Sequence, residues 1–261
     1  MDSYLEICAQ AARAGGRVLL DWRGRFQFRE KAPSDLVTEA DLASQYAIKD
    51  VVLGAFPEHG FLGEEGGEVR SDGQPRWIVD PLDGTMNYVH QLPNYSVSVA
   101  LEHRGQLVVG AVYDPLLDEL FLASAGGGAT LNGSAIRVSS CKCLDQGLIA
   151  ASFSSRVERR SIEVRRFEEV LVQAQGLRRL GSAALNLSYL ACGRLDGYWA
   201  TSVKIWDVAA GLLLLREAGG VVTSIQGQPL DLDRPYFVGA ATSELHRELL
   251  EVLLSVEGAT R

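Results

Sequence analysis

Apolar positions recur at helical spacing along the first part of the chain. Residues 3–22 place apolar side chains along one side, which predicts an amphipathic helix. A second helix is predicted over 39–55, because Pro57 cannot continue it. Short apolar runs near 61–64 and 76–80 are typical of buried strands. The pattern therefore predicts two helices followed by two strands.

The pattern changes twice farther along the chain. Over 95–131 apolar and polar residues alternate, with a turn at Arg104-Gly105, which predicts antiparallel strands. From about residue 139 strands and helices alternate; the strands are predicted near 148–152, 177–180, 197–200, 221–225 and 236–240, and the helices near 158–174, 182–192, 207–218 and 243–255. We therefore expect an N-terminal α+β half, residues 1–140, joined to a C-terminal α/β half, residues 141–261.

Composition narrows the class of protein. No apolar run has the length of a membrane span, and the acidic N-terminus does not resemble a signal peptide, so a cytoplasmic protein is expected. A net charge of −8 argues against nucleic-acid binding, although a phosphorylated substrate remains compatible with it when bound metals invert the local field. The four cysteines are scattered, and free thiols explain Cys141 and Cys143 better than a metal or redox pair.

The segment 77–85 carries two carboxylates at the end of an apolar run. Asp80 and Asp83 flank Pro81-Leu82, which we interpret as a tight turn that aims both side chains and the Leu82 carbonyl at shared metals. Burying two acids without a partner costs several kcal/mol, roughly, so a cation must neutralise them. Hard divalent cations bound through oxygen are the natural candidates.

Other acids stand at the ends of predicted elements. Glu64 closes the run 61–64, Asp207 precedes an apolar helix, and Asp41 lies early in the helix over 39–55. No histidine or cysteine cluster accompanies them, which favours Mg²⁺ or Mn²⁺ over zinc.

In this order the segments resemble the inositol monophosphatase family, over nearly the whole chain. The resemblance rests on Gly63-Glu64-Glu65, Asp80-Pro81-Leu82-Asp83-Gly84-Thr85, Gly181-Ser182-Ala183-Ala184 and Trp206-Asp207-Val208-Ala209-Ala210-Gly211. It implies a five-layer αβαβα sandwich of the inositol monophosphatase and fructose-1,6-bisphosphatase type, with the active site between the halves. It also implies a homodimeric, lithium-sensitive, Mg²⁺-dependent phosphatase that acts on a small phosphorylated metabolite.

The resemblance also implies roles for individual residues. Two or three Mg²⁺ ions, with Mn²⁺ as a substitute, would be held by Glu64, Asp80, the Leu82 carbonyl, Asp83 and Asp207. Thr85 would position the attacking water, Asp41 would accept a hydrogen bond from the Thr85 hydroxyl, and Glu64 would hold a third, weaker ion. Substrate would meet Gly84, Thr85, Gly181, Ser182, Ala183 and Asp207.

Simpler interpretations compete with these roles. Thr85 and Asp207 can each be the cap of a helix, and Asp41 can be a solvated acid in the first turn of one. The segment 181–183 can be no more than the join between a strand and a helix.

One position departs from the family pattern. Ala200 lies seven residues before Asp207, where typical members have a glutamate that binds inositol hydroxyls. A methyl group cannot accept those hydrogen bonds, so histidinol phosphate, a 3′,5′-bisphosphate nucleotide and fructose 1,6-bisphosphate become alternative substrates. A regulatory protein with residual phosphatase activity is the rival of a different class.

Overall fold

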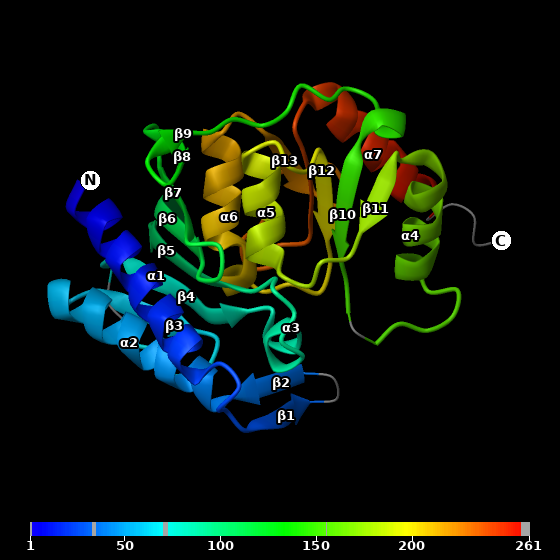
Figure 1. Cartoon of the computed structure of the whole chain (residues 1–261). Helices are drawn as coiled ribbons and strands as arrows, with labels where there is room; N and C mark the ends of the chain where they lie inside the picture. The colour runs from blue at the N-terminus through cyan, green and yellow to red at the C-terminus, as the bar shows by residue number, and fades with distance from the viewer. Residues whose placement is uncertain (1, 33–34, 70–72, 155, 257–261) are drawn as a thin grey trace.

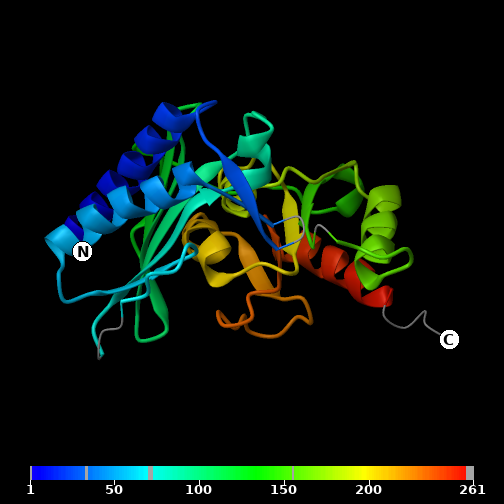
Figure 2. The same cartoon turned by 90° about the horizontal axis from the view of Figure 1, so that it is seen from below.

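The computed structural model describes residues 2–32, 35–69, 73–154 and 156–256 and arranges them in five layers (Figures 1 and 2). Two helices, α1 (Asp2–Trp22) and α2 (Glu39–Ala55), pack on each other and on one face of a seven-stranded sheet. That sheet contains β3 (Gly60–Gly63), β4 (Arg76–Asp83), β5 (Ser96–His103), β6 (Gln106–Asp114), β7 (Glu119–Ser124), β8 (Gly128–Leu131) and β9 (Ser134–Ala135).

The central layer consists of α5 (Ala183–Ala191) and α6 (Ile205–Glu217), which lie between the two sheets (Figure 1). The second sheet contains β10 (Leu148–Ser152), β11 (Gly176–Arg178), β12 (Gly197–Ala200), β13 (Val221–Ser224) and β14 (Phe237–Ala240). Its outer face carries α4 (Ile162–Gln173) and α7 (Ser243–Ser255), with the short 3₁₀ helix η1 (Leu144–Gln146) beside α7. The five-layer αβαβα sandwich is therefore confirmed.

Strand order determines which strand ends meet. The first sheet runs in sequence order from β3 to β9; β3 and β4 are parallel and the other pairs are antiparallel. The second sheet has the order β11-β10-β12-β14-β13, with β11, β10 and β12 parallel. Because β3 and β4 are parallel, their carboxyl ends lie at the same edge of the sheet.

The central helices are apolar on most sides because both sheets cover them. Every residue of α5 except Tyr189 is buried, and so are the eight residues from Val208 to Leu215 of α6. A helix that is apolar all round needs such a two-sided environment. No described helix has the length and the apolar character that would let it cross a membrane.

Several predicted boundaries were wrong. The tight turn after Asp80 is absent: β4 continues to Asp83, and its register with β5 shifts between these two residues. A proline is accommodated at such an irregularity, where a ladder hydrogen bond is already missing. The helix predicted over 158–174 begins only at Ile162, because the Ser161 side chain caps it. The hairpin of β1 (Phe28–Ala32) with β2 (Asp35–Thr38) and the short helix η1 were not predicted, whereas the helix considered at Thr85 is present as the short α3 (Thr85–Val89).

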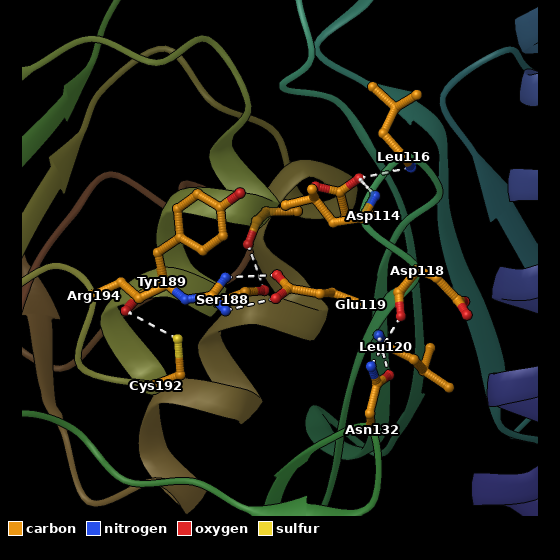
Figure 3. Close-up of polar contacts among 12 residues, drawn as sticks. Asp114, Leu116, Asp118, Glu119, Leu120, Asn132, Ser188, Tyr189, Cys192 and Arg194 are labelled. Carbon is orange, nitrogen blue, oxygen red and sulfur yellow. Dashed lines mark hydrogen bonds and ion pairs between the residues drawn. The ribbon is translucent and has the colours of Figure 1, made fainter.

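An ion pair ties the two parts of the chain together. Both terminal nitrogens of Arg194 lie 2.6 Å from the carboxylate oxygens of Glu119 on β7, and the guanidinium also covers the Tyr189 ring (Figure 3). Because α5 and α6 of the second half pack against the first sheet, the two halves share a core. The division after residue 140 remains a prediction.

Candidate active site

The carboxyl end of β4 is the centre of the site. Asp80 is only 2% exposed and pairs in register with Ser98 of β5, whose hydroxyl donates to the Trp206 carbonyl at 3.1 Å. On the other side, the Glu64 backbone N–H donates to the Val79 carbonyl at 3.1 Å. These contacts bring the ends of β3 and β4 and the start of α6 to one place. The acids Glu64, Asp80 and Asp207 therefore converge, although they lie far apart in the sequence.

Asp83 joins this group from the end of β4. Its Oδ2 accepts hydrogen bonds from the Ser182 hydroxyl at 2.5 Å and from the Ala184 N–H at 2.7 Å, and its Oδ1 accepts from the Ala183 N–H at 3.1 Å. The N-terminus of α5 therefore points at a carboxylate, as the helix dipole favours. Burial nevertheless raises the pKa of Asp83 to about 6, against the effect of these hydrogen bonds.

Each carboxylate of this group makes the ionised form of its neighbours less favourable. Burial, followed by the charges of Glu64, Asp83 and Asp207, raises the pKa of Asp80 well above its ordinary value. Burial and the neighbouring charge of Asp83 raise the pKa of Asp207 to about 8. α6 begins at Ile205 and its N-cap is Lys204, so Asp207 is not the cap residue itself; it lies in the first turn, and its side chain accepts a hydrogen bond from the Lys204 N–H at 2.8 Å. This hydrogen bond and metal binding are compatible, because a carboxylate offers two oxygens.

The acids fit a divalent cation by their chemistry. They supply oxygen donors, Asp80 and Asp83 are buried, and a cation would relieve the mutual repulsion of the group. Within the described parts of the chain, no group of three or more His, Cys, Asp or Glu side chains is arranged so that it could hold a metal ion. The oxygens of Asp83 and Asp207 instead accept hydrogen bonds from the N-termini of α5 and α6.

Thr85 and Asp41 are in contact. The Thr85 hydroxyl lies 3.3 Å from Oδ1 of Asp41 and 3.1 Å from the Leu82 carbonyl oxygen. Asp41 is fully buried and forms a capping box with Thr38, so it is not a solvated acid. Burial raises its pKa to about 7. The N-cap of α3 is Gly84 rather than Thr85, so capping does not explain the threonine.

A cleft of about 450 Å³ opens beside Asp83 and Asp207. Its walls consist of Asp83, Met86, Asn87, Ser152, Phe153, Arg179, Leu180, Gly181, Ala183, Val203 and Asp207. Of the substrate-binding residues predicted from the sequence, Gly181, Ala183 and Asp207 line it. Ser182 is fully buried, while Gly84 and Thr85 lie outside this lining.

Asn87 holds the Gly181 corner in place. Its amide Nδ2 donates to the carbonyls of Asn94 at 2.7 Å and Leu180 at 2.8 Å. Gly181 has φ +92°, and a Cβ there would lie 2.8 Å from Nδ2 of Asn87. A side chain at position 181 would therefore collide with Asn87, so Gly181 is more than a connection between a strand and a helix.

Sequence reasoning missed several cleft residues, including Met86, Phe153 and Arg179. The only available signal for Arg179 was its place two residues before Gly181. Ala200 is fully buried and pairs in register with Ser152, so the altered position lies next to a residue of the cleft wall.

Comparisons with known proteins agree with this geometry. The model of the inositol monophosphatase family matches residues 1–257. Inositol-1-monophosphatase of Rhizobium meliloti is 42% identical over 240 residues, which is 88% of this chain and 89% of the relative. Nus factor SuhB of Xylella fastidiosa is 41% identical over 227 residues, 85% of this chain and 82% of the relative.

A solved structure shares the whole architecture. The extragenic suppressor protein suhB of Bartonella henselae superimposes with a TM-score of 0.92 at 38% identity, covering 96% of this chain and 98% of that one. Matches of this extent in sequence and structure identify the chain as a member of the inositol monophosphatase family.

Proposed function

We propose that this chain is a Mg²⁺-dependent phosphatase that hydrolyses a small phosphate monoester, with an inositol phosphate as the first candidate. The observation that carries the proposal is the environment of Asp80. It is a buried carboxylate whose pKa is raised by burial and by the charges of Glu64, Asp83 and Asp207, and the last two of these acids line the cleft. Membership of a family whose relatives include inositol-1-monophosphatases supports the same activity.

The metal ligands would be Glu64, Asp80, the carbonyl of Leu82, Asp83 and Asp207. When bound, two divalent cations neutralise phosphoryl oxygens, lower the pKa of water and stabilise the leaving alkoxide. Mn²⁺ could replace Mg²⁺ in such an all-oxygen site, and Glu64 is the candidate ligand of a third ion.

The protein's own groups would orient the reactants. The Thr85 hydroxyl, held by Asp41 and the Leu82 carbonyl, would fix the water that attacks phosphorus. Asp41 has a pKa of about 7, which suits a group that accepts a proton near neutral pH. The N–H groups of Gly84 and Thr85 would bind the phosphate. The alcohol part of the substrate would face Gly181, Ala183 and Asp207 in the cleft. Ser182 does not line the cleft and would instead hold Asp83 in position through its hydrogen bond.

A phosphatase screen tests the proposal directly. With Mg²⁺ present, the purified protein should release phosphate from a panel of monoesters, including inositol 1-phosphate, histidinol phosphate, adenosine 3′,5′-bisphosphate and fructose 1,6-bisphosphate. A chelator should abolish the release and Mg²⁺ should restore it. Asp80→Asn should lower turnover by several orders of magnitude, because it removes a charge from the metal ligands. Turnover that persists in Asp80→Asn at saturating Mg²⁺ contradicts the proposal.

Lithium offers a second test of the same site. Li⁺ resembles Mg²⁺ in size but carries half its charge, so we expect it to inhibit by occupying the position that includes Asp83 and Asp207. Inhibition should be uncompetitive or mixed with respect to substrate. Indifference to Li⁺ at concentrations far above that of the substrate contradicts this architecture.

A second candidate comes from the names of other relatives. A protein 41% identical to this chain is a Nus factor, so a regulatory role is an alternative to metabolism of phosphate esters. A chain that releases no phosphate from any ester in the screen would favour that role. A homodimer and a cytoplasmic location, both implied earlier, are part of the proposal and can be checked by sedimentation and by cell fractionation.

A further inference from the structure

Arg179 is fixed in the wall of the cleft by three contacts. Its Cζ lies 4.4 Å from the centroid of the Phe153 ring. Its Nη2 donates to the carbonyls of Phe153 at 2.8 Å and Ser154 at 3.3 Å. An arginine that is stacked on one face and bonded through one nitrogen has lost much of its side-chain freedom before any ligand binds. The guanidinium is therefore preorganised.

The remaining N–H groups of Arg179 are available to a ligand. Among the described residues, the guanidinium has hydrogen-bond partners at Nη2 alone. Partial burial lowers the pKa of this side chain, which indicates a partly desolvated cation, and arginine stays charged at neutral pH. Nε–H and Nη1–H can each donate a charge-assisted hydrogen bond to an oxygen of a carboxylate or phosphate.

The charges of the cleft lining are asymmetric. Asp83 and Asp207 provide the acids, and Arg179 is the single basic side chain among the described residues that line it. The acidic part is where the proposed cations and the scissile phosphate belong. A ligand that also reaches Arg179 needs a second negative charge on its alcohol part.

The rest of the wall is poorly suited to a polyol. Met86, Phe153 and Val203 offer apolar surface. The Asn87 amide N–H groups already donate to two carbonyls, and the Ser152 hydroxyl accepts a hydrogen bond from Tyr198. Ala200 has no acceptor where typical members of the family have a glutamate.

We propose that Arg179 binds a second anionic group, a carboxylate or a second phosphate, on the alcohol part of the substrate. The inference rests on the proposed phosphatase function and changes its first candidate, because it places esters with a second anionic group ahead of an inositol monophosphate. Arg179 is then a residue that determines specificity, and the preferred esters are those with at least two anionic groups.

Matched substrate pairs test this role. Fructose 1,6-bisphosphate is compared with fructose 1-phosphate, and 3-phosphoglycerate with glycerol 1-phosphate, each pair differing by one anionic group. The wild-type protein should favour the doubly anionic member by about tenfold to a hundredfold in kcat/KM, the range for one charged hydrogen-bonded contact. The pair with the larger ratio identifies phosphate or carboxylate as the second group.

Variants at two neighbouring arginines provide the comparison. Arg179→Gln should bring the ratio close to one, and Arg179→Lys, which keeps a point charge, should restore part of it. Arg178→Gln is the matched control. Arg178 lies outside the cleft lining, and among the described residues its side chain bonds only the Leu177 carbonyl, so the ratio of this variant should equal that of wild type. Circular dichroism confirms that each variant is folded, and Arg179→Lys replaces Arg179→Gln if the latter unfolds.

Three results overturn the proposal: a wild-type ratio near one, an unchanged ratio in Arg179→Gln, or an equal loss in Arg178→Gln. Absence of hydrolysis with every ester would instead defeat the proposed function. Isothermal titration with the same pairs, in the presence of Mg²⁺, then decides the anion site by itself. Equal Kd values within each pair count against it, and a preference that Arg179→Gln removes supports it.

Discussion

The hydroxyl of Ser182 donates a 2.5 Å hydrogen bond to Oδ2 of Asp83, and 99 residues separate the two in sequence. The contact joins the end of β4 in the first sheet to the N-terminus of α5 in the central layer. The N–H groups of Ala183 and Ala184 point at the same carboxylate. Asp83 therefore has a structural function in addition to its proposed role as a metal ligand, because it orients α5 toward the cleft.

Removing the Ser182 hydroxyl should destabilise this join. In Ser182→Ala, Asp83 loses a charge-assisted hydrogen bond and the N–H of Leu185 loses its capping oxygen. We expect the free energy of unfolding to fall by about 2–3 kcal/mol. Urea denaturation in the absence of metal measures it.

Ser188→Ala is a suitable control, since Ser188 is also buried on α5 but its hydroxyl bonds, among the residues that the structure describes, only the Ala184 carbonyl within the helix. This variant should lose about 1 kcal/mol or less. If the two variants lose the same free energy of unfolding, the hydrogen bond to Asp83 contributes no more than an ordinary hydrogen bond within a helix.

Thr85 should be required for turnover rather than for folding. Thr85→Val keeps the shape of the side chain but removes the hydroxyl that contacts Asp41 and the Leu82 carbonyl. A group that positions and activates water contributes about 10²- to 10⁴-fold, so kcat should fall by that range. Steady-state kinetics at saturating Mg²⁺ measure the loss.

Thr85→Ser keeps the hydroxyl and should retain most of the activity. If Thr85→Ser and Thr85→Val lose turnover equally, the methyl group is what matters and the assignment of the hydroxyl is wrong. Thermal denaturation of both variants separates a loss of catalysis from a loss of folded protein.

The metal-free protein should become less stable as the pH rises from about 6.5 to 8. Burial raises the pKa of Asp41 to about 7 and, with the charge of Asp83, that of Asp207 to about 8, whereas an unfolded aspartate titrates near 3.9. The folded state thus binds more protons than the unfolded state in this window. Stability then decreases with pH, by about 1–2 kcal/mol across it.

An opposing effect is weak in most of this window. Burial lowers the pKa of His59 and His246, which gives stability the opposite slope, but that slope fades by about pH 7.5, where an unfolded histidine is nearly deprotonated. Melting temperatures in a chelator, at four pH values, measure the slope; Mg²⁺ should flatten it and Asp207→Asn should reduce it. A melting temperature that rises with pH in the chelator contradicts the expectation.

The candidate acids could be found from the sequence because each stands beside an apolar run, either after it or before it. Asp80, Asp83 and Asp207 were located in this way, since a carboxylate beside a buried strand or helix needs a partner. The resemblance to a family assigned a role to each of them. The register shift after Asp80 could not be foreseen, because Pro-Leu-Asp-Gly is equally compatible with a tight turn.

Contacts between distant segments could not be predicted either. Nothing in the local sequence relates Ser182 to Asp83 or Arg179 to Phe153. The first contact arises where the N-terminus of α5 meets the end of β4, and the second arises because β10 and β11 are paired strands. The hairpin β1–β2 was missed because its first strand, Phe28–Ala32, has three charged residues in succession and no alternating apolar face. Strand propensity and apolar periodicity do not indicate a strand that lacks an apolar face.

Ala200 offers the sharpest test of how this cleft selects its substrate. It pairs in register with Ser152 on the adjacent strand β10, and residues that are paired in register point to the same face of a sheet. Because Ser152 lines the cleft, a longer side chain at position 200 would extend toward the same space. A glutamate at position 200 would therefore place a carboxylate at the wall of the cleft.

Ala200→Glu should raise kcat/KM for inositol 1-phosphate, relative to p-nitrophenyl phosphate, by about tenfold to a hundredfold, since a charged acceptor for ring hydroxyls contributes about 1.5–3 kcal/mol. The same variant should disfavour substrates with a second anionic group, because the new carboxylate repels them. Ala200→Leu fills the same space without a charge and should produce neither effect. Both ratios come from one set of initial-rate measurements. If the wild-type protein already prefers inositol 1-phosphate and Ala200→Glu leaves that preference unchanged or lowers it, another group binds the ring and the loss of the family's glutamate does not set the specificity.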